Sequence, residues 1–271
     1  MKERTTYPSS LTDEQYLLLD PLLPGRRNNT SKGGAPEKYT FRQILDGILY
    51  LMRTGIPWRY MPHDLPPWEI VYHYWRAWEQ DGTWERINDA LREQVRVKAG
   101  KKPTPSAGVL DSQSVKSVHK SERLTGYDAG KKVKGIKRHV LTDTTGMLLD
   151  VAVTPANWSD VQGGRLLNFV GLAAALPEMR CVFADSSYTG LVIWVAVMAY
   201  WLLRIVKGKK EQKGFEVQPM RWIVERTFGW ISKHRRLRCD YEGLPETSRA
   251  AVYVAMIDTM VRRLKPAELR C

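Results

Sequence analysis

Three acidic residues lie where their carboxylates could hold divalent cations. Asp111 ends the apolar run of residues 108–110, and Asp185 ends the run of residues 181–184. Glu225 lies in a segment with the apolar spacing of a helix. Two strand-end aspartates and one helical glutamate can converge on a pair of cations, which activate a water or hydroxyl in phosphodiester chemistry and stabilise the leaving oxygen. The pattern therefore predicts a metal-dependent phosphoryl-transfer site.

The positive charge of the chain lies beside these acids. The formal net charge is +13 over 271 residues. Residues 116–139 hold eight Lys or Arg residues against two acids, residues 204–239 hold eleven against three, and the rest is close to neutral. A cationic rim around an acidic site suits a polyanion that is both bound and cut. Solvated basic loops are the alternative, but both segments flank candidate catalytic positions, which favours nucleic acid.

Composition narrows the class of protein. The apolar fraction of 43% is enough for a buried core, and the length fits one large domain or two ordinary ones. The longest apolar run, residues 191–203, is shorter than the roughly twenty residues that span a membrane. The three cysteines form no C-x-x-C pair, so neither a zinc site nor a disulfide framework is indicated. Without a visible signal peptide, we expect a cytoplasmic protein.

Residues 1–103 are predicted to form an all-helical domain. Thr12 and Gln15 have the spacing of a capping box, which starts a first helix. Helices joined by short turns are compatible with helix-turn-helix DNA binding, and a plain helical bundle is the alternative. The other helices are expected over residues 40–55, 67–82 and 84–97.

Residues 104–271 are predicted to form an α/β domain, because short apolar runs alternate there with helical segments. Hairpin-joined strands followed by alternating helices indicate a mixed five-stranded sheet with flanking helices, whose strand ends meet at one edge. The strands are expected over residues 109–115, 139–142, 147–154, 180–184 and 202–206, with a hairpin turn at 143–146. The helices are expected after Ser159, over residues 189–200 and 219–236, and, as an amphipathic helix, over residues 246–264.

Four segments together resemble the DDE transposases of bacterial insertion sequences. They are residues 109–116, 126–139, 184–188 and 221–230, and the similarity extends over nearly the whole chain. The family has a ribonuclease-H-like catalytic domain, whose strand order agrees with the predicted sheet. The resemblance implies catalytic and metal-binding roles for Asp111, Asp185 and Glu225.

The resemblance also implies an activity. Such a transposase cleaves the ends of its insertion sequence and joins them to target DNA, by metal-dependent phosphoryl transfer without a covalent protein intermediate. The implied cofactor is Mg²⁺, with Mn²⁺ as a substitute. The implied DNA partners are the ends of the element and the target, both double-stranded, and the implied protein partner is a second copy of the chain, in a homodimer or higher multimer. No membrane is involved. The implied location is the bacterial cytoplasm, in association with the nucleoid when the protein is bound to DNA. The residues expected to bind DNA are Lys131, Lys132, Lys134, Lys137, Arg138, Arg221, Lys233, Arg235 and Arg236.

Two other functions stay open from the sequence. One is a catalytically silent DNA-binding protein derived from such an enzyme, against which the intact acids argue. The other is a ribonuclease-H-like nuclease that cleaves without strand transfer. Only a search for joined DNA products separates this nuclease from a transposase.

Overall fold

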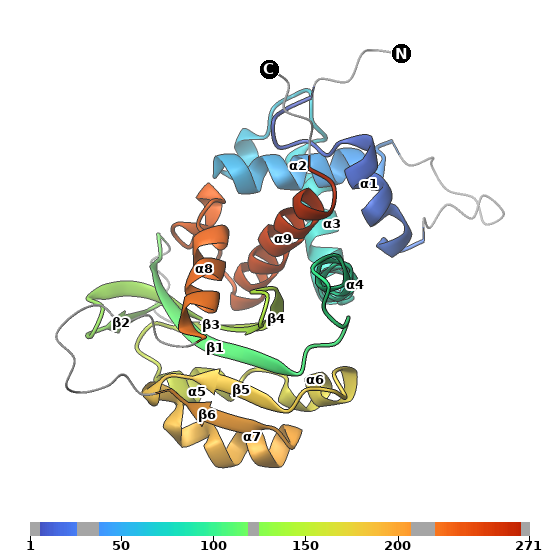
Figure 1. The fold of residues 1–271 in the computed structure, drawn as a ribbon. Coiled ribbons are helices and arrows are strands. Elements are labelled where there is room, and N and C mark those ends of the chain that lie inside the picture. Colours follow the sequence, from blue (N-terminus) through green and yellow to red (C-terminus); the bar gives the residue numbers. More distant parts are fainter. Residues whose placement is uncertain (1–5, 26–37, 119–124, 207–219, 267–271) are drawn as a thin grey trace.

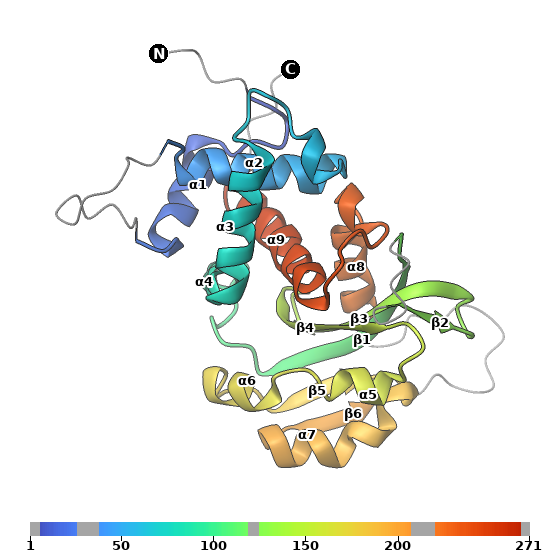
Figure 2. The same cartoon turned by 180° about the vertical axis from the view of Figure 1, so that it is seen from behind.

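The computed structural model describes residues 6–25, 38–118, 125–206 and 220–266. Within these ranges, a mixed β-sheet lies between two sets of helices, and the N-terminal helices pack beyond one of the two sets (Figure 1). The view from behind shows the same layers (Figure 2). None of the described helices is long and apolar enough to cross a membrane.

The N-terminal helices begin where their caps predict. The Thr12 hydroxyl accepts a hydrogen bond from the Gln15 amide, and the Gln15 side chain accepts one from the Thr12 amide, which starts α1 (Asp13–Leu19). Thr40 repeats this arrangement at α2 (Phe41–Thr54), which ends at Gly55 with a positive φ of 74°. The starts of α1 and α2, the end of α2 and the remaining helices confirm the helical pattern predicted for this part of the chain. The remaining elements are η1 (Asp20–Leu22), η3 (Trp58–Tyr60), α3 (Trp68–Gln80) and α4 (Thr83–Lys98).

The sheet is built around β1, which pairs antiparallel with β3 on one side and parallel with β5 on the other. β6 adds to β5 in parallel, and β4 pairs antiparallel with β3. This is the strand order expected of a ribonuclease-H-like domain, and it confirms the predicted mixed sheet. The strands are β1 (Ala107–Lys116), β2 (Gly126–Asp128), β3 (Val133–Asp143), β4 (Leu148–Pro155), β5 (Cys181–Ala184) and β6 (Leu202–Ile205).

The strand β3 is longer than predicted, and the short strand β2 makes a sixth strand beside its first residues. The predicted start at His139 is six residues too late, because the preceding basic residues have the composition of a loop. In the structure Lys137 and Arg138 are buried, and they donate hydrogen bonds to the carbonyls of Trp158 and Leu237, both at 2.9 Å. Pairing on both sides of β3 outweighs the local pattern.

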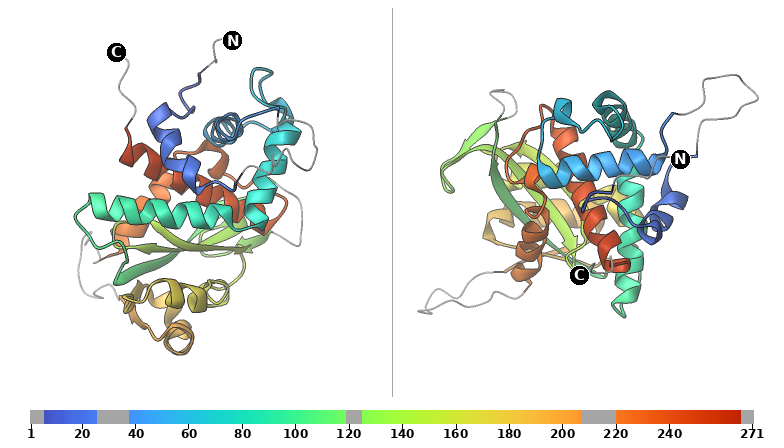
Figure 3. Two further views of the ribbon diagram at one scale, coloured as in Figure 1. Left: turned by 90° about the vertical axis from the view of Figure 1, so that its right-hand side faces the viewer. Right: turned by 90° about the horizontal axis from the view of Figure 1, so that it is seen from above.

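One face of the sheet is covered by three helices and one 3-10 segment. α5 (Asp160–Gly164) begins at the predicted cap Ser159, whose hydroxyl accepts a hydrogen bond from the Gln162 amide. η4 (Ser186–Leu191) and α7 (Val192–Ala199) together replace the single helix predicted there, and α6 (Phe169–Ala175) was not predicted. Viewed from the side, helices lie above and below the sheet (Figure 3).

The opposite face is covered by α4, α8 (Arg221–Ile231) and α9 (Pro245–Leu264), with η5 (Arg235–Leu237) connecting the last two helices. α9 was predicted to be amphipathic, but most of its residues are buried, because it packs against α1, α2, α3, α4, α8 and β4. One hydrophobic core runs from the N-terminal helices through α9 to this face of the sheet. α9 is therefore shared by the N-terminal helices and the sheet.

Candidate active site

The ends of β1 and β5 bring two of the predicted acids together. The parallel ladder between these strands ends with Leu110 opposite Ala184, so Asp111 and Asp185 follow at the same edge. Leu110 and Ala184 belong to the core beneath α5 and α7. Because side chains alternate along a strand, both aspartates face the side of the sheet that α8 covers. Burial is the largest cause that raises the pKa of Asp111, and the nearby charge of Asp185 adds to it.

The carboxyl group of Asp111 is largely removed from water. Burial raises its pKa to about 6, against the opposing effects of the Ser112 amide and of the positive charges of Arg221 and Lys131. The Ser112 amide donates to Asp111 Oδ1 at 2.7 Å, and Arg221 Nη2 lies 4.0 Å from Asp111 Oδ2. A desolvated carboxylate of this kind is stabilised by any additional positive charge.

The third predicted acid, Glu225, lies on α8 and is exposed. It follows Arg221 by four residues, so the two side chains share one side of the helix. The buried side of α8 contains Ile223, Val224 and Thr227. In the described parts of the chain, no three Asp, Glu, His or Cys side chains lie close enough to hold a metal ion. The structure thus brings Asp111 and Asp185 together, and Arg221 of α8 lies 4.0 Å from Asp111.

Asp185 is fixed by the segment that follows it. Its side chain caps η4, where Asp185 Oδ1 accepts a hydrogen bond from the Ser187 amide at 2.9 Å and another from the Ser187 hydroxyl. Asx caps of this type hold a carboxylate in one orientation. The position of the second acid is therefore determined by local chain geometry.

A second layer of polar groups lies behind the aspartates, and it has no recognisable pattern in the sequence. Asp160 Oδ1 accepts a hydrogen bond from the Ser112 hydroxyl at 2.7 Å and lies 3.3 Å from Lys137 Nζ. His139 Nδ1 is 3.4 Å from the Tyr188 hydroxyl and 3.9 Å from Asp160. Burial lowers the pKa of His139 to about 4, so the imidazole is neutral at pH 7. His139 therefore contributes a buried polar contact and no positive charge.

Comparison with known proteins decides the family. The family model described as a transposase DDE domain matches residues 102–257. The chain belongs to the DDE transposases. A second model, for candidate transposases of the IS4/5 family, matches residues 11–88 of this transposase. The family implies a nucleic-acid-processing enzyme that binds DNA and uses divalent metal ions.

Two relatives come from insertion element IS402 of Burkholderia cepacia. An uncharacterised 16.2 kDa protein is 28% identical over 116 residues, which are 42% of the transposase and 78% of that relative. A protein named as a candidate transposase for IS402 is 31% identical over 116 residues, which are 40% of the transposase but only 54% of that relative. No solved structure matches the transposase significantly.

Three residues that were expected to bind DNA need a correction. Lys137, Arg138 and Arg236 are only 7%, 0% and 4% exposed. Arg236 pairs with Glu242 at 2.7 Å and donates to the Ile56 carbonyl at 2.9 Å. A buried basic residue whose donors satisfy internal acceptors does not present its charge to DNA, so these three stabilise the fold of the transposase.

The other expected DNA-binding residues remain accessible. The turn between β2 and β3 is organised by Asp128, whose Oδ1 accepts hydrogen bonds from the amides of Gly130 and Lys131, both at 3.0 Å. Arg221 is partly buried beside Asp111. Part of the second basic segment, residues 207–219, lies outside the described residues. The exposed members of the expected set are Lys131, Lys132, Lys134, Lys233 and Arg235.

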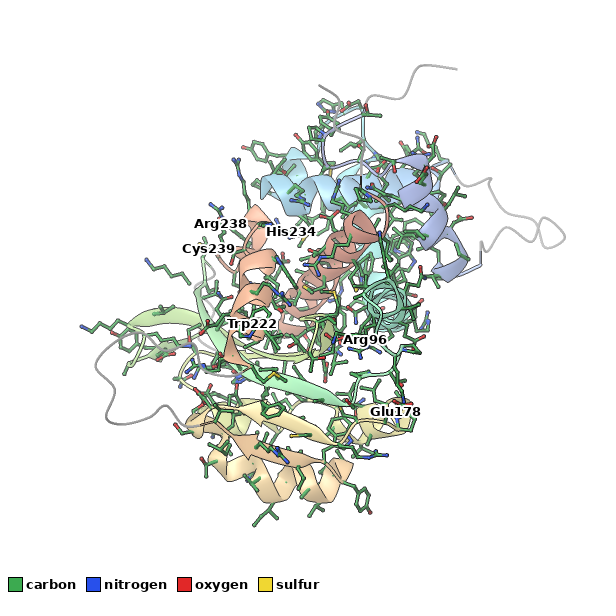
Figure 4. All side chains as sticks on the ribbon, viewed as in Figure 1. Arg96, Glu178, Trp222, His234, Arg238 and Cys239 are labelled. Carbon is green, nitrogen blue, oxygen red and sulfur yellow. The ribbon has the colours of Figure 1, made fainter. Side chains whose placement is uncertain are left out.

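Two of the exposed basic residues outside the expected set lie on, or just after, elements that carry expected site residues. They are Lys116, at the end of β1, and Arg238, just after η5. Arg238 lies beyond the end of α8, and Trp222 lies at the start of that helix (Figure 4). Both basic residues belong to the segments with excess positive charge, and that excess was the one signal that could have identified them.

Proposed function

We propose that this transposase cleaves the ends of its insertion sequence and joins the released 3′ ends to target DNA, with Asp111, Asp185 and Glu225 as the catalytic carboxylates. The observation that carries the proposal is the pairing of β1 with β5, which sets Asp111 beside Asp185. The approach of α8 supports the third role, because Arg221, one turn before Glu225, lies 4.0 Å from Asp111.

The donor groups fit a hard divalent cation. The side chains at the two strand ends are carboxylates. Burial raises the pKa of Asp111 to about 6, so its charged form is poorly solvated and would be stabilised by a bound cation. Oxygen donors of this kind favour Mg²⁺, with Mn²⁺ as a substitute. When bound, such ions lower the pKa of an attacking water or 3′-hydroxyl and stabilise the leaving oxygen.

The residues of the chain orient and bind the DNA. Asp111 and Asp185 sit on paired strands, which gives a rigid base for positioning the reacting groups. Arg221 supplies positive charge next to Asp111, where a scissile phosphate would lie, and a guanidinium suits phosphate oxygens. The exposed lysines of the β2–β3 turn and the residues Lys233, Arg235 and Arg238 would hold the flanking backbone.

We assign recognition of the element ends to residues 1–103 and the chemistry to residues 104–271. Support comes from the short connection between α3 and α4, where Gly82 has a φ of 73°, as expected of helices joined by a tight turn. The two element ends must be processed together, so we propose that a homodimer or higher multimer forms on DNA. The three proposed catalytic carboxylates all belong to residues at the ends of sheet strands or on α8.

The test uses the full-length chain, a duplex carrying one end of the insertion sequence, and Mg²⁺. The wild type should nick the duplex at the element boundary and generate products joined to a second, target duplex. Asp111→Asn should abolish both products and keep DNA binding, because an amide is a much weaker cation ligand. Glu93→Gln, an exposed acid on α4, is the control that should leave both products unchanged.

The outcomes separate the alternatives. Nicking without joined products would favour a nuclease without strand transfer. Binding without nicking by the wild type would favour the silent DNA-binding derivative. Near-normal cleavage by Asp111→Asn would contradict the proposed carboxylate mechanism.

A further inference from the structure

Asp160 links the ends of the two catalytic strands from behind. Its carboxylate accepts a hydrogen bond from the Ser112 hydroxyl at 2.7 Å, directly after Asp111, and α5, the helix that Asp160 begins, packs against η4, which follows Asp185. Ser112 points to the face of β1 opposite Asp111, because side chains alternate along the strand. The β1–β5 ladder ends one residue before the aspartates. Asp160 and the helix that it begins therefore connect the two chain segments just beyond the last backbone pairing.

The carboxylate is held as an anion in this position. Lys137 Nζ lies 3.3 Å from Asp160 Oδ1 and also donates to the Trp158 carbonyl at 2.9 Å, so the ammonium is fixed on two sides. Burial alone would raise the pKa of Asp160, but the Ser112 hydrogen bond and the Lys137 charge hold it below its usual value. The buried lysine thus serves the acid behind the site and is not a DNA contact.

Two glycines allow α5 to bring Asp160 this close to the sheet. A Cβ atom added at Gly163 would lie 1.9 Å from His139 Nε2, and one added at Gly164 would lie 2.4 Å from Leu191 Cδ1. Both distances are far below van der Waals contact. The helix that begins with Asp160 therefore lies directly on His139 and on the segment that follows Asp185.

We propose that Asp160 is a positioning residue that sets the separation and orientation of Asp111 and Asp185, and hence the affinity of the site for divalent cations. The proposal rests on the proposed function, because it takes these two aspartates as the cation ligands. Asp160 itself lies on the other side of β1 and does not touch DNA or the cation. Hydrogen-bonded groups behind metal ligands typically change metal affinity by 10–100-fold when they are removed.

The test measures Mn²⁺ affinity directly, by calorimetric titration of the full-length protein, and the Mn²⁺ concentration that gives half-maximal cleavage. Ser112→Ala and Asp160→Ala should each weaken Mn²⁺ binding about 10-fold or more. Both should recover most of the cleavage rate at high Mn²⁺. Asp160→Asn keeps an oxygen acceptor for Ser112 and should lose less affinity than Asp160→Ala. The double variant should be no weaker than Asp160→Ala, because both changes remove the same link.

The matched control is Ser114→Ala. Ser114 lies on the same face of β1, and its hydroxyl also donates to an acid, Asp128, at 2.5 Å, but it is two residues farther from the aspartates. This variant should bind Mn²⁺ like the wild type. Cation-free melting temperatures of the Ser112 and Ser114 variants should agree, which excludes a general loss of stability.

Three outcomes would overturn the inference. They are wild-type Mn²⁺ affinity in Ser112→Ala and Asp160→Ala, equal weakening by Ser112→Ala and Ser114→Ala, or lost cleavage that Mn²⁺ does not restore. Asp111→Asn separates a failure of the proposed function from a failure of the role of Asp160 alone. If that variant also binds Mn²⁺ and cleaves normally, the proposed function fails; if it loses both while Asp160→Ala is normal, only the role of Asp160 fails.

Discussion

At the scale of single residues, Asp258 joins three segments of the chain. This buried carboxylate on α9 accepts hydrogen bonds from Arg53 Nη2 at 2.6 Å, His234 Nε2 at 2.9 Å and Arg262 Nε at 2.7 Å. Burial alone would raise its pKa, but the His234 hydrogen bond and the neighbouring positive charges outweigh burial and lower the pKa to about 2. Asp258 therefore ties α2 and the end of α8 to α9.

We expect Asp258→Asn to lower the free energy of unfolding by about 3 kcal/mol at pH 7, because it leaves buried positive charge without its partner. The folded-state pKa lies below the unfolded value, so the stabilisation is present above about pH 4 and is lost as the pH falls towards 2. Urea unfolding of both proteins at several pH values measures the difference. The difference should shrink as the pH falls, and a constant difference between pH 7 and pH 2.5 would contradict this account.

Residue positions were predictable from the sequence only where a local pattern marks them. Asp111 and Asp185 each end a short apolar run, and the structure places them at neighbouring strand ends. Asp160 has no such signal, because its contact with Ser112 joins positions 48 residues apart. Arg138 was misread for the same reason: its acceptor, the Leu237 carbonyl, is distant in sequence. Catalytic roles for the three acids stay predictions until variants are assayed.

At the scale of elements, the turn between β2 and β3 presents exposed lysines. We expect replacement of Lys131, Lys132 and Lys134 by glutamine to reduce the slope of log affinity for DNA against log salt by up to roughly 2.7, since each lost phosphate contact on duplex DNA removes about 0.9. Gel-shift titrations at several salt concentrations measure the slope. The control replaces Arg165 and Arg180, exposed basic residues just after α5 and just before β5 that lie outside residues 1–103 and outside the expected DNA-binding set. An unchanged slope in the triple variant would exclude phosphate contacts by this turn.

The close packing of α5 gives a second prediction at this scale. Gly163→Ala should lower the free energy of unfolding by about 1–3 kcal/mol, because the new methyl group overlaps His139. Gly229→Ala is the matched control, since a Cβ there has nothing within 4 Å and alanine favours a helix by up to about 1 kcal/mol. Urea unfolding should therefore shift in opposite directions for the two variants. Equal shifts would mean that α5 moves freely away from the sheet.

Elements with local end signals were predicted well. The capping box at Thr12, the start of α2 after Thr40, and the hairpin turn closed by Gly146 with a φ of 83° lie where the sequence indicated. The strand predicted for β3 was too short. Its basic residues Lys137 and Arg138 are buried because they pair with groups far away in the sequence, which the local pattern does not contain. Pairing energy from neighbouring strands is invisible in a single segment.

At the scale of the whole molecule, the N-terminal helices and one face of the sheet share a single hydrophobic core through α9. The boundary predicted between residues 103 and 104 marks a change in composition. That it also separates recognition of the element ends from catalysis stays a prediction. The order of elements was readable from the sequence, but the position of α9 among the N-terminal helices was not. Its apolar residues show that it is buried, and they do not show what covers it.

We expect the full chain to unfold in one cooperative transition. Trp75, on α3, is fully buried in the shared core, and Trp75→Ala should cost about 3–5 kcal/mol. Because the core is common, hydrogen exchange should become faster in β3 and β4 as well as in the N-terminal helices. Calorimetry and native-state hydrogen exchange measure the two effects. Acceleration confined to residues 1–103, or two separate melting transitions, would show that the two parts fold independently.

The burial of α9 also has a consequence during synthesis of the protein. A ribosome makes the N-terminal helices and the sheet first, but the helix that both pack against is residues 245–264. Until residues 245–264 have left the exit tunnel, the apolar surfaces that α9 covers in the folded protein stay exposed to water. Nascent chains should therefore depend on chaperones for most of their elongation. A reading frame interrupted before residue 245 should yield only material for proteolysis. Decayed copies of such a gene would then leave no folded fragment to compete with the intact enzyme for DNA.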